Sequence, residues 1–139
     1  MRQIVKSKKY LGYEYAVMFY SNEWTGSFLF MGEFLFMDEW YCGYVKIPKN
    51  HNLYELGYRR NMPYLGFENE TIESYFDVHG GITFAGRILG INNTWFLGFD
   101  CAHYGDNTIT QDADYTEREC KKLIDQIVAL EKGVNHEKN

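Results

Sequence analysis

The stretch "YTERECKKLIDQIVALEKG", residues 115–133, decides the fold. Its apolar side chains recur at intervals of three and four residues, which predicts an amphipathic helix with one face on a core. These side chains are Cys120, Leu123, Ile124, Ile127 and Leu130. Thr116 with Glu119 three residues later matches a capping box, so we expect Thr116 to be the N-cap. Gly133 predicts the end of the helix, and residues 133–139 are expected to form a frayed tail.

Upstream of this helix, the chain alternates apolar and polar residues as strands do. Residues 13–20 ("YEYAVMFY") and 41–48 ("YCGYVKIP") predict two strands, the second ended by Pro48, which cannot donate to a ladder. Between them, "SNEWTG" supplies turn residues and "SFLFMGEFLFM", residues 27–37, predicts one or two more strands. Residues 50–69 show no sustained period and predict a surface excursion that could include a short helical turn.

Two further segments predict a hairpin-like pair of strands. "ESYFDVHGGITFAG", residues 73–86, indicates a strand that enters a double glycine and continues beyond it. "WFLGFDCAH", residues 95–103, is the next strand, and the turn formers of "RILGINN" join the two. The expected architecture is therefore α+β, an antiparallel β-sheet with a C-terminal α-helix packed on one face.

Length and composition narrow the function classes. We expect the 139 residues to form a single domain, residues 1–139, whose 18% of aromatic residues suit half-buried sheet surfaces. The net charge of −5, with no basic run beyond residues 6–9, argues against general nucleic-acid binding, which depends on phosphate neutralisation. The three cysteines are far apart in the sequence. No apolar run is long enough to span a membrane. We therefore expect reduced thiols in a cytoplasmic protein.

Candidate functional residues gather in "VHGGITFAG" and "WFLGFDCAHYGD", residues 78–86 and 95–106. Cys101 and His103 share one face if the strand persists that far, and His79 or Cys42 could complete a zinc site with them. Zinc sites usually show two such arms of ligands. We therefore expect no cofactor, with zinc as the alternative.

The same residues allow catalysis. Cys101 could act as a nucleophile with His79 or His103 as its base, and Asp100 or Asp106 would then orient that base. Alternatively, His79 or Asp100 could be the general acid or base for a phosphoester or glycosidic bond. The structural interpretation is that Cys101 is a small buried hydrophobe and that His79 only hydrogen-bonds Asp100 or Asp106 across the hairpin.

Ligand binding is the third interpretation of these two runs. Gly80 and Gly81 let the backbone approach a ligand closely or cradle an anion, or they form a bulge that bends the sheet. Aromatic side chains could stack a base, and cations could meet phosphates. The aromatic and cationic candidates are Tyr44, Trp95, Tyr104, Lys46, Arg59, Arg60 and Arg87. The predicted ligand-binding set is His79, Gly80, Gly81, Asp100, His103, Asp106, Tyr44, Trp95 and Arg87.

These blocks resemble a family of small proteins from tailed bacteriophages and prophages. The first block is "CGYV", residues 42–45, followed by Pro48, His51 and Tyr54. "VHGGITFAG" and "WFLGFDCAHYGD" are the second and third, and a helix with a cysteine follows at residues 117–130. The resemblance covers residues 41–130 and leaves residues 1–40 outside. The chain departs from the family at Asn52, where a proline usually follows the first histidine.

The resemblance implies a context, since no activity is established for the family. It implies a phage gene product in the cytoplasm of an infected bacterium, where such accessory proteins often blunt host defence by binding or destroying a nucleotide signal. We therefore expect a small-ligand-binding protein that sequesters a nucleotide-type immune signal, with homo-oligomer formation left open. The alternatives are a hydrolase of a nucleotide or another phosphorylated small molecule and an inhibitor that binds a host protein, so enzymatic activity stays open.

Overall fold

The computed structural model describes residues 2–21, 38–64, 66–67, 69–88 and 94–138, the last five of them by their backbone alone. The elements of this part follow in the order β1 (Arg2–Tyr10), β2 (Tyr13–Ser21), β3 (Glu39–Ile47), α1 (Ile72–Tyr75), β4 (Phe84–Arg87), β5 (Trp95–Asp100) and α2 (Ala113–Lys138). The described strands form a five-stranded antiparallel sheet of order β1-β2-β3-β5-β4. The predicted strand at residues 27–37 lies outside the described residues.

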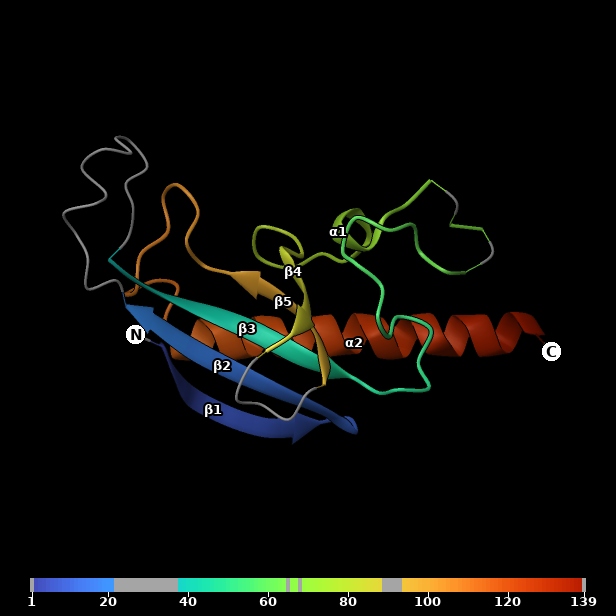
Figure 1. Ribbon diagram of the computed structural model, residues 1–139, viewed down its shortest axis with the longest axis horizontal. Coiled ribbons are helices and arrows are strands. Elements are labelled where there is room, and N and C mark those ends of the chain that lie inside the picture. The colour runs from blue at the N-terminus through green and yellow to red at the C-terminus, as the bar shows by residue number, and fades with distance from the viewer. Residues whose placement is uncertain (1, 22–37, 65, 68, 89–93, 139) are drawn as a thin grey trace.

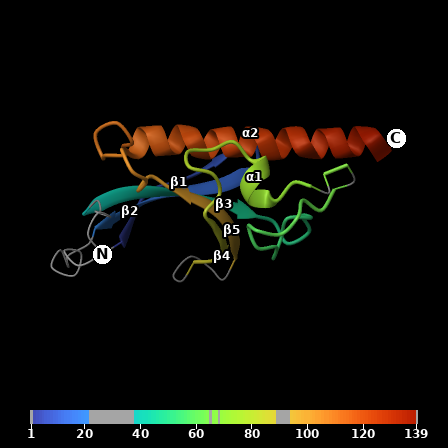
Figure 2. The same ribbon diagram turned by 90° about the horizontal axis from the view of Figure 1, so that it is seen from above.

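The long helix α2 lies along one face of this sheet (Figures 1 and 2). It contacts β1, β2 and β3, which confirms the predicted α+β architecture with a C-terminal helix on the sheet. No helix in the described part of the chain is both long and apolar enough to cross a membrane.

The two faces of the sheet pack against different side chains because residues alternate along each strand. Val17, Val45 and Leu97 belong to a fully buried cluster with Leu123 and Ile124 of α2. Burying each of these aliphatic side chains contributes about 1.5–3 kcal/mol. The opposite face carries a second buried cluster, formed by Met18, Cys42, Tyr44, Ile88 and Phe96. The predicted apolar stripe of α2 is buried as expected, from Cys120 to Leu130.

Sheet and helix pack tightly at Gly43 of β3. Gly43 pairs with Phe99 of β5, and a Cβ atom at Gly43 would lie 2.4 Å from Phe99 Cζ and 2.6 Å from Cys120 Sγ. Only a residue without a side chain leaves room for both groups. Gly43 therefore sets how closely α2 can lie on the sheet.

The predicted start and end of the helix are wrong. α2 begins at Ala113, and the carboxylate of Asp112 accepts a hydrogen bond from the backbone N–H of Tyr115 at 2.8 Å. Asp112 thus caps the helix one turn before the expected N-cap. Thr116 lies inside the helix, where its hydroxyl donates to the Asp112 carbonyl at 2.8 Å. The helix also continues past Gly133 to Lys138, because one exposed glycine costs a helix only about 1 kcal/mol.

The strand expected before the double glycine is also wrong. Residues 72–75 form helix α1, which begins with a capping box. The hydroxyl of Thr71 accepts from the backbone N–H of Ser74, and the hydroxyl of Ser74 accepts from the backbone N–H of Thr71. Gly80 and Gly81 then take φ angles of +71° and +81°, which interrupt an extended chain. Only the part after the glycines is a strand, and it pairs with β5 as predicted.

Two other segments differ from the sequence pattern. β1 was not predicted, since its nine residues are mostly exposed and follow no buried period; pairing with β2 places it at the sheet edge. Lys6 of β1 also forms ion pairs with Asp114 and Glu117 of α2 at 3.1 and 3.2 Å. The described residues between 50 and 69 form mostly turns, as predicted, and the buried side chains of Leu53 and Met62 anchor this segment to the core.

Gly43→Ala tests the close packing of α2. We expect the added methyl group to lower the free energy of unfolding by about 1–3 kcal/mol, because Phe99 and Cys120 must shift to admit it. Urea denaturation followed by circular dichroism measures this loss. Gly133→Ala is the control: nothing lies within 4 Å of its Cβ position, so the same change in α2 should stabilise by about 0.5–1 kcal/mol. Equal stability of the two variants would contradict the packing argument.

Candidate functional site

The loop after α1 and the turn after β5 meet at the start of α2. His79 is at the centre: its Nε2 atom lies 2.8 and 2.9 Å from the two carboxylate oxygens of Asp106. Its Nδ1 atom lies 2.7 Å from the hydroxyl of Tyr115. The predicted alternative in which His79 pairs with Asp106 is therefore confirmed. We call these residues, His79, Asp106 and Tyr115, together with His103, Asp100 and Glu119, the histidine cluster.

Backbone hydrogen bonds hold the histidine cluster in place. The backbone N–H of His79 donates to Glu119 of α2 at 2.7 Å. Asp106 accepts from the backbone N–H of His103 at 2.9 Å, within a tight turn that also contains Gly105 at a φ of +93°. Helix α2 therefore supplies two of the groups that position His79, the Tyr115 hydroxyl and the Glu119 carboxylate.

A second histidine–aspartate pair lies beside the first. His103 Nε2 is 3.3 Å from Asp100 Oδ1, an ion-pair distance, although this buried nitrogen makes no hydrogen bond. Asp100 accepts instead from the hydroxyl of Thr83 at 2.9 Å and from the backbone N–H of Ala102 at 3.1 Å. The rings of His79 and His103 are 5.8 Å apart. The structure therefore brings together both predicted histidines and both predicted aspartates.

Gly80 makes room for the second pair. A Cβ atom at Gly80 would lie 2.1 Å from His103 Nε2, whereas one at Gly81 would meet nothing closer than the Glu73 carbonyl at 3.7 Å. The double glycine of the sequence thus has two different functions. Gly80 lets His103 approach the loop, and Gly81 accommodates the positive φ alone.

Cys101 does not join the histidine cluster. The strand β5 ends at Asp100, so the condition under which Cys101 and His103 would share a face is not met. Cys101 lies in the core with Leu97 and Phe99, as the structural interpretation predicted. Its Sγ atom lies 3.6 Å from the hydroxyl of Thr116, and burial raises the pKa of the thiol to about 12. Cys42 belongs to the cluster on the other face of the sheet. Within the described ranges, no three His, Cys, Asp or Glu residues are arranged to hold a metal ion.

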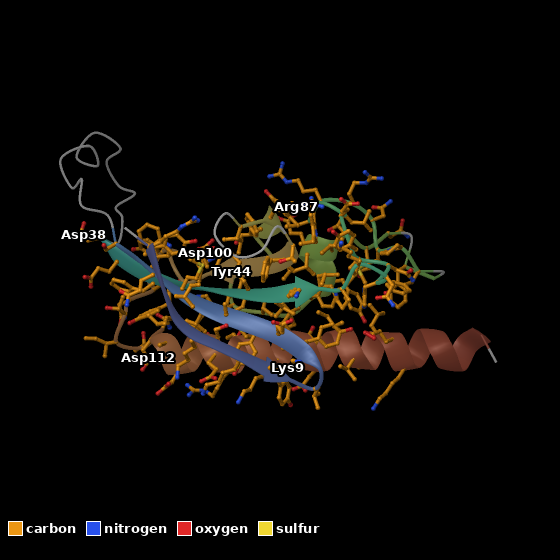
Figure 3. All side chains as sticks on the ribbon, turned by 60° about the horizontal axis from the view of Figure 1, so that its bottom comes forward. Lys9, Asp38, Tyr44, Arg87, Asp100 and Asp112 are labelled. Carbon is orange, nitrogen blue, oxygen red and sulfur yellow. The ribbon has the colours of Figure 1, made fainter. Side chains whose placement is uncertain are left out.

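Charge in the histidine cluster is predominantly negative. Asp100, Asp106 and Glu119 contribute carboxylates, and in the described part of the chain none of them forms an ion pair with a lysine or arginine. The predicted phosphate-binding cation, Arg87, lies elsewhere. In the sheet, Arg87 of β4 is the backbone partner of Trp95 at the beginning of β5, whereas Asp100 is at the end of that strand. Figure 3 shows the separation between Asp100 and Arg87.

The remaining aromatic and cationic candidates are distributed over other surfaces. Tyr44 lies on the face away from α2 and shares a 2.8 Å hydrogen bond with the hydroxyl of Tyr20. Tyr104 is fully exposed at the tip of the turn. Arg59 and Arg60 are exposed on the loop before α1. None of these four residues contacts a ring or carboxylate of the histidine cluster in the described structure.

A groove lies at the other end of β5, near Trp95 and Arg87. It encloses about 340 Å³ and is lined by Gly12, Tyr13, Glu14, Lys46, Ile47, Pro48, Lys49, Tyr54 and Thr94. A smaller hollow of about 70 Å³ shares Glu14, Lys46 and Thr94 with it. We call the larger one the lysine groove.

Comparison with protein-family models, with curated proteins and with solved structures finds no match to this chain. The function is therefore argued from the geometry of the histidine cluster and the lysine groove. Sequence reasoning missed Tyr115 and Glu119 in the first and Lys49 and Tyr13 in the second. One signal was available for Glu119, whose position in the first turns of the helix was noted but interpreted as a cap.

Replacing Gly80 and Gly81 separately tests whether the position of His103 depends on the missing side chain at Gly80. Both Gly80→Ala and Gly81→Ala carry the cost of a left-handed backbone, but only Gly80→Ala forces His103 away from Asp100. We expect changed imidazole resonances of His103 in NMR spectra of Gly80→Ala, with about 1 kcal/mol more lost stability than in Gly81→Ala. If the His103 resonances are the same in both variants, Gly80 does not determine the position of His103.

Thiol labelling tests whether a cysteine belongs to any reactive site. Cys42, Cys101 and Cys120 are buried, and burial raises the pKa of each thiol. We expect an aromatic disulfide reagent to modify none of them in the native protein at neutral pH and all of them in urea, because the thiolate is the reactive form. Rapid reaction of Cys101 in the native state would contradict this expectation and would support the predicted role of Cys101 as a nucleophile.

Proposed function

We propose that the protein binds a small, ring-bearing anion of the nucleotide type in the lysine groove. The observation that carries this proposal is the groove itself, about 340 Å³ lined by Lys46, Lys49 and Tyr54. Sites for small molecules usually enclose about 300–1,000 Å³ and combine apolar walls with a few polar groups. The groove has this size and this mixture.

The cations of the groove favour an anionic ligand. Lys46 Nζ lies 3.0 Å from Glu14 Oε2 in a partly exposed ion pair at the wall of the groove. Lys49 is exposed, and none of the ion pairs in the described structure includes it. With one carboxylate and two ammonium groups, the lining is cationic in a chain of net charge −5. Such a local field raises the concentration of anions at the groove.

Aromatic and unpaired polar groups beside the lysines favour a ring. Tyr54 lines the groove, and the Arg87 guanidinium lies 5.9 Å from the centre of its ring and 5.3 Å from that of Trp95. Arg87 is itself paired with Glu55 at 2.6 Å, so it holds the rings in place and does not add a free cation. Thr94 Oγ1, on the lining of the groove, is buried without a hydrogen-bond partner, and so is Nε1 of the adjacent Trp95. Leaving such a group unpaired costs about 1–3 kcal/mol, which a ligand with matching polar atoms would recover.

The resemblance to the phage family supplies the proposed biological role, namely sequestering a nucleotide-type signal in an infected bacterium. The groove supports binding over turnover, because its lining contains no histidine or cysteine and its one carboxylate is paired with Lys46. The predicted contacts Trp95 and Arg87 do not line the groove but lie beside it, since Trp95 follows Thr94 and Arg87 lies over the ring of Tyr54. The histidine cluster is at the other end of β5 and is not part of this site.

Titration calorimetry with adenosine monophosphate tests the proposal. We expect measurable binding of the nucleotide and much weaker binding of adenosine, because the phosphate is what meets the lysines. Lys49→Ala should weaken binding of the nucleotide at least about tenfold, which corresponds to about 1.4 kcal/mol.

Lys122→Ala is the matched control, since it removes the same charge from the surface of α2. Lys122 forms only an exposed ion pair with Asp77 at 3.4 Å, which contributes little to stability. Binding should be unchanged in this variant. Equal weakening by both substitutions would mean that net charge, not the groove, attracts the nucleotide.

A further inference from the structure

The histidine cluster contains a chain of hydrogen bonds that the groove does not use. It runs from the carboxylate of Asp106 through the ring of His79 to the hydroxyl of Tyr115, with contacts of 2.8 Å and 2.7 Å. The three residues come from the turn after β5, the loop after α1 and the first turn of α2. A nucleophile bonded to a base, which is itself oriented by a third group, is the recurrent arrangement of covalent catalysis.

We propose that Tyr115 is a nucleophile, that His79 is its general base, and that Asp106 is a positioning residue for His79. The direction of the hydrogen bonds supports these roles. Asp106 can only accept, so His79 carries its proton on Nε2 and leaves Nδ1 free to accept the proton of the Tyr115 hydroxyl. This tautomer is assigned from the bonding network.

Asp106 is itself held firmly, which the positioning role requires. The backbone N–H of His103 donates to Asp106 Oδ2, and the backbone N–H of Asp106 donates to the His103 carbonyl, both at 2.9 Å. The side chain of Asp106 is 8% exposed and that of His79 18% exposed. The base is therefore oriented by a buried carboxylate and still reachable from solvent.

The surroundings determine when the phenol loses its proton. Burial, and then the carboxylate of Glu119, raise the pKa of Tyr115 above its usual value. The free phenolate is thus not populated at neutral pH, and the proton must pass to His79 as the new bond forms. The same holds for the serine hydroxyl of a Ser-His-Asp triad.

The carboxylates also restrict the substrate. Arg118 is the cation whose charge also acts on Tyr115, but the carboxylates of Asp100, Asp106 and Glu119 outnumber it. They would repel a phosphate or another anion from this end of the sheet. The class that fits is an ester with an uncharged acyl group. This activity is separate from the proposed nucleotide binding and does not rest on it.

The reaction proceeds in two balanced steps. Tyr115 Oη forms a bond to the acyl carbon, the ester C–O bond breaks, and the phenol proton passes through His79 Nδ1 to the departing alkoxide. A water molecule then attacks the acyl-tyrosine, again giving its proton to His79, and the proton returns to Tyr115 Oη as that bond breaks. No oxidant, metal or cofactor takes part.

Reaction with p-nitrophenyl acetate tests the proposal. We expect a burst of p-nitrophenolate and one acetyl group on Tyr115, located by peptide mapping, with no release from p-nitrophenyl phosphate. Tyr115→Phe should remove the burst, His79→Ala should slow it about 100-fold, and Asp106→Asn at least about tenfold. Circular dichroism verifies that each variant is folded.

The fully exposed Tyr104 provides an internal reference that needs no substitution. In the unaltered protein Tyr115 should be acetylated much faster than Tyr104, although Tyr104 is the more accessible of the two. Acetylation of Tyr115 at or below the rate of Tyr104 would overturn the proposal and leave the hydrogen-bonded chain as a structural link. Lys122→Ala, which removes an exposed ion pair on α2, should leave the burst unchanged. Nucleotide binding is measured separately by calorimetry, so failure of one site is distinguishable from failure of the other.

Discussion

The packing of α2 on the sheet at Gly43 is the constraint on which the rest of the structure depends. Because Gly43 has no side chain, Phe99 and Cys120 can occupy the space above it, and the helix lies directly on β3. The position of α2 on β3 also determines the position of the first turns of the helix. They bring Tyr115 and Glu119 to the loop that carries His79, so the core packing also assembles the histidine cluster.

The two candidate sites lie at opposite ends of β5 and differ in charge. The end at Asp100 gathers carboxylates around two histidines, and the beginning at Trp95 lies near lysines, Tyr54 and Arg87. A single ligand with one phosphate cannot be matched to both environments, since the first repels anions and the second attracts them. The separation therefore argues for two independent sites on one small sheet.

Much of the fold could be predicted because its central elements have buried faces. The stripe from Cys120 to Leu130 and the alternation in β2, β3 and β5 follow directly from which side chains enter the core. β1 could not be predicted, since its exposed residues form a strand through pairing with β2 and not through burial. The helix start was misplaced because Asp112 and Thr116 are both good caps, and only tertiary structure selects between them.

The candidate site was predicted in part. The pairing of His79 with Asp106 was among the predicted alternatives, because both residues flank a hairpin-like pair. Tyr115 carries no signal in the sequence, since one tyrosine near a helix start is indistinguishable from the other aromatic residues. The separation of Arg87 and Trp95 from the histidines depends on strand register, which periodicity alone does not determine.

Mapping the nucleotide on the protein by NMR tests the central claim most directly. Adenosine monophosphate is added to ¹⁵N-labelled protein, and changes in backbone amide and tryptophan indole resonances are followed. The account predicts the largest changes at Lys46, Lys49, Tyr54 and the indole of Trp95, with His79 and Asp106 unaffected. Changes centred on His79 and Asp106, or no changes at all, would contradict it.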